Sequence, residues 1–293
     1  MPRLYGWHFR SGGETIGARR RCAVSSAVRH PAVAGRFYPG DPKVLLRDVK
    51  SYSGAGGQKI DALGCVVPHA GYMYSGHVAG AVYARLKLPR RYVILCPNHT
   101  GAGEPLAIMS AGTWRTPLGE ARIDQTLAGE LMRSHRWLAE DAAAHRSEHA
   151  LEVQLPFLQA LQPEFTFVPI ALGTANYEVL ASLGKAIAAV LATQKEKTLI
   201  IASSDMNHYE SDAITRVKDG KAIEKLLARD ARGLYEVVVS EDISMCGFGP
   251  AVAMLSAAGE LGAKSAELVK YATSGDISGD RSAVVGYAGV VVS

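Results

Sequence analysis

The sequence lacks the long apolar run that a membrane-spanning helix needs. None of its hydrophobic stretches approaches the ~20 residues of such a span, although 48% of its 293 residues are hydrophobic. The N-terminal residues also lack the apolar core of a secretory signal. We therefore expect neither a membrane partner nor secretion.

Cysteine is scarce, and no two of the four cysteines form a Cys-x-x-Cys pair. A disulfide framework belongs to short, cysteine-dense secreted chains. We therefore expect a reducing, cytoplasmic setting.

Four common motifs are absent, namely GxxxxGK[ST], a strand-linked GxGxxG, GxSxG and HExxH. Nucleotide binding by the first two loops and serine esterase chemistry are therefore unsupported.

Surplus positive charge is confined to residues 1–29, which hold six arginines and one acid. The remaining residues carry 26 basic and 27 acidic side chains, so the body has no basic surplus for nucleic acid. We expect residues 1–29 to form a flexible, arginine-rich extension and residues 30–293 to form one folded domain.

Apolar, strand-like runs alternate with helical patterns throughout residues 30–293. This alternation predicts a three-layer α/β/α domain with a mostly parallel central sheet. We expect Ser147–Leu161 to be one helix, kinked at Pro156. The main predicted strands are Ala62–Val67, Tyr92–Cys96, Phe165–Leu172 and Thr198–Ala202, and the main predicted helices are Ser75–Leu86, Tyr177–Thr193 and Pro250–Leu261.

Two histidines follow predicted strands. His69 comes directly after the first strand, and His99 follows the second strand 30 residues later, which is about the length of one βαβ unit. Parallel strands end at one edge of a sheet, where neutral imidazoles can share a first-row metal ion. The alternative is two loop histidines that make ordinary hydrogen bonds.

Cys246 lies directly ahead of a predicted helix, in the sequence MCGFGP. The positive end of that helix would lower the thiol pKa and favour a thiolate, which is both a soft metal ligand and a nucleophile. The alternative is a buried cysteine that acts as a small hydrophobe.

Further polar residues cluster near predicted strand and helix ends. His208 follows a strand, with Asp205 three residues earlier, a pattern that suits general acid–base work but also an ordinary Asx-type turn. Glu148 opens a predicted helix, where an acid is favoured by the helix dipole. His149 and Glu152 share one face of that helix and could support a metal site from the second shell.

Six segments follow one another in a specific order and spacing over residues 30–293, namely PHAGYMYSG, PNH, TPLGEARID, EHALEVQLPF, SSDMNHY and MCGFGPAVAML. In this order and spacing they resemble the Memo family, also known as protein B of the AmmeMemoRadiSam system. That family is similar to the catalytic subunit of class III extradiol dioxygenases, which use non-haem Fe(II). The resemblance implies the same three-layer fold.

The resemblance implies a role for several of these residues. His69 and His99 correspond to the two histidine ligands of the metal, and Cys246 stands where the dioxygenases place a carboxylate ligand. His208 corresponds to their catalytic base, with Asp205 in the same cleft. By the same analogy Glu148 and His149 line the cleft. We also expect Glu152, Asn98 and Tyr72 to line the cleft or to support the metal ligands from behind.

Cysteine in place of a carboxylate is softer, favours copper or a redox role, and is itself oxidisable. The expected cofactor is therefore iron or copper, with zinc as an alternative. Three functions stay open, namely a metal-dependent redox enzyme, a non-catalytic module that binds metal or peptide, and a metal-assisted hydrolase. The resemblance implies a small molecule or peptide in the cleft, and radical-SAM and AMMECR1-type proteins as functional partners.

Overall fold

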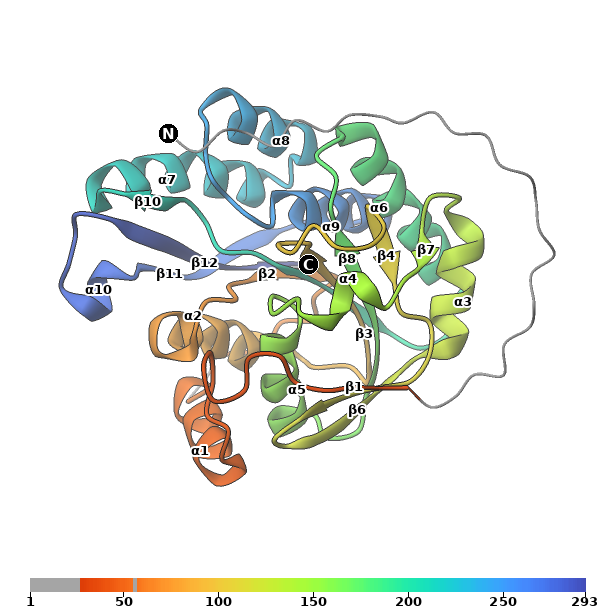
Figure 1. The fold of residues 1–293 in the computed structure, drawn as a ribbon. Coiled ribbons are helices and arrows are strands. Elements are labelled where there is room, and N and C mark those ends of the chain that lie inside the picture. Colours follow the sequence, from red (N-terminus) through yellow and green to blue (C-terminus); the bar gives the residue numbers. More distant parts are fainter. Residues whose placement is uncertain (1–26, 55–56) are drawn as a thin grey trace.

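A large β-sheet forms the middle layer of the protein, with helices on both of its faces (Figure 1). The computed structural model describes residues 27–54 and 57–293. The strands follow the order β1-β5-β6-β8-β3-β9-β2-β12-β10, with β11 beside β12, β4 beside β8, and β7 beside β4. Their bounds are β1 Val28–Arg29, β2 Gly64–Val67, β3 Arg91–Pro97, β4 Leu106–Ile108, β5 Thr113–Thr116, β6 Gly119–Ile123, β7 Ala139–Glu140, β8 Thr166–Leu172, β9 Thr198–Ser203, β10 His208–Glu210, β11 Ala266–Thr273 and β12 Val284–Val292.

The centre of the sheet is parallel, and its edges are mixed. The pairs β6–β8, β8–β3, β3–β9 and β9–β2 are all parallel, whereas β12 runs antiparallel to β2, β10 and β11. Every residue of β2 and β9 is buried, because helices cover both faces of the central sheet. Strands buried in this way have nearly continuous apolar sequences. The predicted fold class, with its mostly parallel central sheet, is confirmed.

Successive residues of a central strand enter opposite apolar layers. In β3, Val93 and Leu95 pack in one hydrophobic cluster, and Tyr92, Ile94 and Cys96 pack in the other, as the two-residue period of a strand requires. The first cluster lies under α3 Gln125–Ser134, α6 Tyr177–Leu191, α7 Asp212–Ala228, α8 Ala231–Ser240 and α9 Phe248–Glu260.

The second cluster lies under the helices of the opposite face, and the remaining helices are short. Among the described residues, no helix combines the length and the apolar character needed to cross a membrane. The helices of the opposite face are α1 Pro42–Tyr52, α2 Tyr72–Arg85 and α5 Leu155–Leu161. The short helices are α4 Ala143–Arg146, α10 Gly275–Ser278 and the 3-10 helix η1 Glu152–Gln154.

The prediction of a single kinked helix over Ser147–Leu161 is wrong. Residues 147–151 lie outside any helix, η1 follows, and Pro156 stands in the first turn of α5. Proline fits the first turn because its missing N–H would have no helical partner there. Glu148 and His149 therefore lie in a loop, which frees them from helical spacing.

The folded body begins earlier than predicted. The extension expected over residues 1–29 lies outside the described residues up to residue 26, but Val28–Arg29 form β1, which pairs with β5. Arg29 is buried and forms an ion pair with the fully buried Glu152. Its guanidinium also donates to the carbonyls of His145 and Glu148, at 3.1 and 2.8 Å.

Replacing Arg29 by alanine should lower the free energy of unfolding by about 3–5 kcal/mol, because it leaves a buried carboxylate without its counter-ion. Urea denaturation at 25 °C measures this. The control is Arg232→Ala, which removes a pair with Glu178 in which the two side chains are 53% and 77% exposed, and which should cost about 1 kcal/mol or less. Equal losses in the two variants would contradict the prediction.

Candidate metal centre

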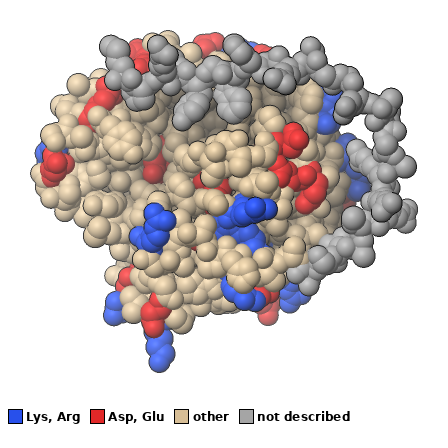
Figure 2. All heavy atoms as spheres, viewed as in Figure 1, with Lys and Arg blue, Asp and Glu red and all other residues tan. Residues whose placement is uncertain are grey.

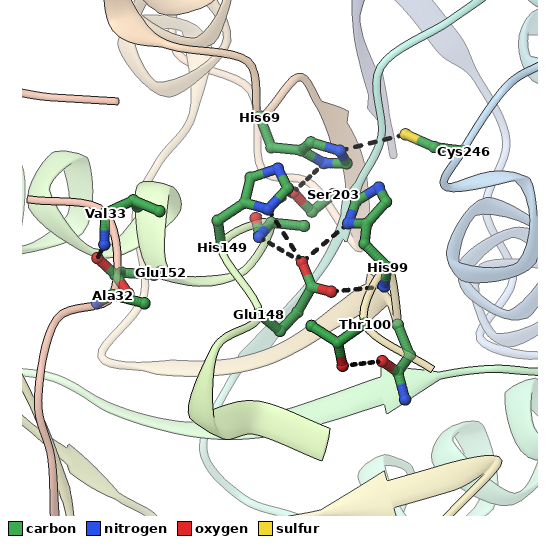
Figure 3. Close-up of polar contacts among 12 residues, drawn as sticks. Ala32, Val33, His69, His99, Thr100, Glu148, His149, Glu152, Ser203 and Cys246 are labelled. Carbon is green, nitrogen blue, oxygen red and sulfur yellow. Dashed lines mark hydrogen bonds and ion pairs between the residues drawn. The ribbon is translucent and has the colours of Figure 1, made fainter. Parts of the chain in front are cut away.

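Three histidines meet at the carboxyl ends of the parallel strands (Figure 3). His69 follows β2, His99 follows β3, and His149 lies in the loop between α4 and η1. Each offers one ring nitrogen, and these three atoms lie within 4.8 Å of one another. We call these residues the three-histidine group. It could hold a metal ion, since imidazole nitrogen is a common ligand of first-row metals.

The buried carboxylate of Glu148 orients two of these rings (Figure 3). The Nδ1 of His99 donates to Oε1 over 2.9 Å, and the backbone N–H of His99 donates to Oε2 over 2.6 Å. The Nδ1 of His149 lies 3.5 Å from the same Oε1, and the N–H of Ala150 donates to it over 2.8 Å. With Nδ1 turned to the carboxylate, Nε2 of each ring stays free for a ligand, as in carboxylate–histidine–metal arrangements.

The third ring is oriented by a hydroxyl group. Ser203 Oγ donates its only hydrogen to the carbonyl of Ala150 over 2.6 Å and accepts from Nε2 of Gln154 over 2.8 Å. The Nδ1 of His69, 3.0 Å from the same oxygen, must therefore be the donor, because a hydroxyl has one hydrogen. This fixes the His69 tautomer and leaves Nε2 with its lone pair.

The pKa of His99 is shifted in the opposite direction from that of the other two histidines. Burial lowers the pKa of His99, but the hydrogen bond and charge of Glu148, helped by Asp205, outweigh burial and raise it above the ordinary 6.5. Burial raises the pKa of Glu148, and its bond to His99 outweighs this and lowers it below 4.5. Without metal, these two groups therefore form a charge-assisted pair.

Burial keeps the other two imidazoles neutral. It lowers the pKa of His69 well below 6.5, and the positive charge of His99 lowers it further. It lowers the pKa of His149 by more than Glu148 raises it. Neutral imidazole is the form that binds metal, so the donor set fits a first-row ion.

Cys246 lies beside this group. Its Sγ is 3.2 Å from Nε2 of His69 (Figure 3), although the sulfur is not among the three atoms that lie within 4.8 Å of one another. The turn can come this close because Gly247 has no side chain, and a Cβ there would lie 2.3 Å from the carbonyl oxygen of Ser203.

For Cys246 the sequence left a thiolate and a buried neutral thiol both open, and the surroundings in the structure favour the neutral thiol when no metal is bound. Burial first, and then the charge of Asp205, raise the pKa of this thiol well above 9.0. Hydrogen bonds with the backbone of Asp205 and Gly247 lower the pKa of the thiol, but by less. A bound metal ion would displace the proton, because thiolate is the form that coordinates.

The predicted acid–base residues line the same cleft. The backbone N–H groups of His69 and Ala70 donate to Oδ1 of Asp205 over 2.7 and 3.2 Å, so this carboxylate fastens the end of β2 to the end of β9. Burial raises the pKa of Asp205 above 3.8. The Nδ1 of His208 donates to the carbonyl of Ser244 over 2.9 Å, which leaves its Nε2 with the lone pair.

The structure separates the other predicted residues from the three-histidine group. Glu152 faces away from it, toward Arg29, the amides of residues 32 and 33, and the hydroxyl of Tyr38. Tyr72 is buried and donates to the carbonyl of Val153. Asn98 lines the cleft, where its side chain holds the loop that follows β3.

Two contributions were not expected from the sequence. His149 was expected to support a metal from outside, but it lies within the three-histidine group itself. Ser203 and Gln154, which set the tautomer of His69, were not singled out at all. Ser203 stands at the end of a predicted strand beside the segment that carries Asp205 and His208, and this neighbourhood was the available signal.

The three-histidine group opens into a cleft of about 1220 Å³. One side of the cleft consists of residues from the loop after β3, and another consists of residues 242–250, which lead into α9. Such volume suits a small molecule or the side chain of a peptide. The arrangement can therefore place a ligand between three imidazoles, a thiol and the imidazole of His208.

Comparison with known proteins gives a consistent family. The model of the family described as "Memo-like protein" matches residues 29–291. A MEMO1 family protein of Methanosarcina barkeri is 44% identical over 267 residues, or 90% of this chain and 100% of that protein. A MEMO1 family protein of Methanopyrus kandleri is 43% identical over 277 residues, or 90% and 98%.

The fold is also found in a solved structure. The crystal structure of an uncharacterized protein from Escherichia coli K12 matches with a TM-score of 0.51 and 12% sequence identity. The match covers 78% of this chain and 98% of that one. At this identity the likeness shows the fold alone.

We predict that His69 and His208 both carry their proton on Nδ1 in metal-free protein at pH 8, because each Nδ1 lies within hydrogen-bond distance of an oxygen that can only accept from it, Ser203 Oγ and the Ser244 carbonyl. Long-range ¹⁵N–¹H correlation spectra of imidazole-labelled protein distinguish the two tautomers, and His69→Ala and His208→Ala variants assign the signals. A proton on Nε2 of either residue would show that its Nδ1 contact is not a donor bond.

Proposed function

Since the chain belongs to the Memo-like family, we propose that it is a metal-dependent redox enzyme acting on a small molecule or peptide in the cleft. In this proposal His69, His99 and His149 hold one first-row metal ion, and Cys246 is the softer donor beside it. The observation that carries the proposal is the fixed orientation of the rings, whose Nδ1 atoms face Ser203 or Glu148.

Bound iron or copper would supply electron exchange with the substrate and polarisation of a substrate oxygen. The side chains of the protein supply binding and proton handling. His208 is held by Ser244 at Nδ1, so its Nε2 can take a proton from a group in the cleft. Asp205 keeps the His69 segment in place and adds a buried acidic group next to it.

A metal-assisted hydrolase is the second candidate, and the placement of His208 in the same cleft favours it. Such an enzyme would use a redox-inert ion such as zinc, with His208 as general base. A non-catalytic module that binds metal or peptide is the third candidate. Metal identity and substrate turnover distinguish the three, because only the redox enzyme requires an ion that changes its oxidation state.

Protein purified without oxygen should contain about one metal ion per chain, and the double variant His69→Ala/His99→Ala should lose it, because two of three ligands are gone. Elemental analysis measures both. His77→Ala is the control, since His77 lies on α2 and does not line the cleft. Cys246→Ser should lose affinity for Cu(I) and keep it for zinc. Unchanged metal content in the double variant would refute the proposed site.

Glu148→Gln should weaken zinc binding about 10–100-fold at pH 8, because the uncharged amide is a poorer partner for the His99 and His149 rings. It should also change the pH dependence. A proton on His99 competes with metal, and Glu148 raises the pKa of His99, so affinity falls with acidification at a higher pH in the natural protein than in the variant.

Competition titrations with a chromophoric chelator between pH 5.5 and 8.5 measure both effects. The matched control is Glu104→Gln, which removes the same charge from the same cleft without touching the three-histidine group. Identical pH profiles for Glu148→Gln and the natural protein would show that Glu148 does not control His99.

A further inference from the structure

Backbone strain is concentrated at the cleft. Among the described residues, three that are not glycine have a positive φ, and two of them line the cleft, Tyr209 at 60° and Asp242 at 51°. The third, Arg229 at 57°, ends α7 and does not line the cleft. Left-handed backbone is unfavourable for a residue with a side chain, and such strain gathers at functional sites.

A β-bulge produces the strained conformation of Tyr209. In the pairing of β10 with β12, His208 lies opposite Val285 and Glu210 lies opposite Val284, with a shift of register between them. Tyr209 is thus the extra residue, and bulges commonly re-aim a side chain next to an active site. Its ring centroid is 5.6 Å from that of His208.

Packing does not explain this conformation. The Tyr209 side chain is 79% exposed, so its ring gains little from burial in the fold. The conformation is nevertheless held firmly. Lys218 pairs with Glu210 over 2.8 Å and donates to the carbonyl of Asp242 over 2.9 Å, and so it fastens both strained segments together.

The charged residues of the cleft limit which ligands can bind beside Tyr209. Among the described residues that line it there is no lysine or arginine, whereas Glu104, Asp205 and Asp242 are present. Figure 2 shows acidic side chains gathered on the surface over β4 and β7. The loop that follows β3 leads into β4. A phosphorylated or otherwise polyanionic ligand would find no basic side chain on these walls.

Apolar surface and an aromatic face complete the site. Phe37, Leu172 and Phe248 line the cleft together with Tyr209. The face of a tyrosine ring attracts an ammonium or guanidinium group, and the apolar residues can cover the body that carries it. Acidic groups nearby add to this preference.

We propose that Tyr209 determines specificity in this cleft, and that its ring binds an amine or similar cation carried on an apolar body. This rests on the proposed function only in taking the cleft as the substrate site. The strained bulge then has a purpose, since it presents the ring to a ligand beside the imidazole of His208.

Three probes with the same ring and different charge test the preference, namely phenethylamine, 2-phenylethanol and phenylacetate. Dissociation constants are measured by NMR titration of the full chain, as purified and after chelator treatment, which removes carboxylate binding to metal. In the chelator-treated chain we expect phenethylamine to bind tightest and phenylacetate at least about 10-fold more weakly. Tightest binding of phenylacetate there, or no binding of phenethylamine, would overturn the proposal.

Variants test the residue itself. Tyr209→Phe should bind phenethylamine as the natural protein does. Tyr209→Gly should bind it at least about 10-fold more weakly, while its melting temperature stays unchanged or rises by roughly 2–4 °C as the strain is relieved. Arg229→Gly is the matched control, because it relieves the same kind of strain away from the cleft and should leave the affinity unchanged.

Unchanged affinity in Tyr209→Gly, or an equal loss in Arg229→Gly, would overturn the role of Tyr209. These results are independent of metal content. If the chain contains no metal but ranks the probes as expected, this inference is supported and the proposed redox function is refuted. If the chain contains metal but binds phenylacetate most tightly after chelation, this inference is refuted and the proposed metal site is supported.

Discussion

The candidate centre depends on one buried carboxylate, that of Glu148. A charge fully removed from water is stable only when hydrogen bonds and counter-charges surround it. Glu148 meets this demand with the ring and backbone of His99, the amide of Ala150 and the nearby ring of His149. The need to satisfy a buried charge thus draws the end of β3 and the loop before η1 together, and the same contacts turn the two rings toward a shared ligand position.

The support continues outward from this carboxylate through Arg29. Its guanidinium binds the carbonyl of Glu148 and forms an ion pair with Glu152, four residues further along. The two acids therefore face opposite ways, one toward the three-histidine group and one toward the N-terminal strand. Fixing the loop at both ends limits its motion, and a metal site requires ligands whose positions vary little. The N-terminal strand is in this sense part of the candidate centre.

Sequence patterns predicted the sheet and the strand-end histidines because both follow from local rules. β2, β3, β8 and β9 are continuous apolar runs, and His69 and His99 follow two of them directly, so parallel pairing brings them to one edge. His149 could not be placed in the same way. Its position depends on the contact between Glu148 and His99, 49 residues apart, and on a loop where the sequence pattern indicated a helix. The sequence could not decide between a thiolate and a neutral thiol at Cys246 for a related reason, since the burial that raises the pKa of this thiol is a property of the whole fold.

Two parts of the cleft are held in different ways, namely its floor at the three-histidine group and its mouth at Tyr209 and Asp242. The floor, next to the three-histidine group, consists of side chains at strand ends and of Glu148 and Gln154, and a connected set of hydrogen bonds holds them. The mouth includes two left-handed residues, Tyr209 and Asp242, linked by Lys218. Among the hydrogen bonds of the described residues, none joins Tyr209 to Glu148 or Ser203. A substitution at Tyr209 is therefore expected to change ligand preference without disturbing the residues that hold the three-histidine group.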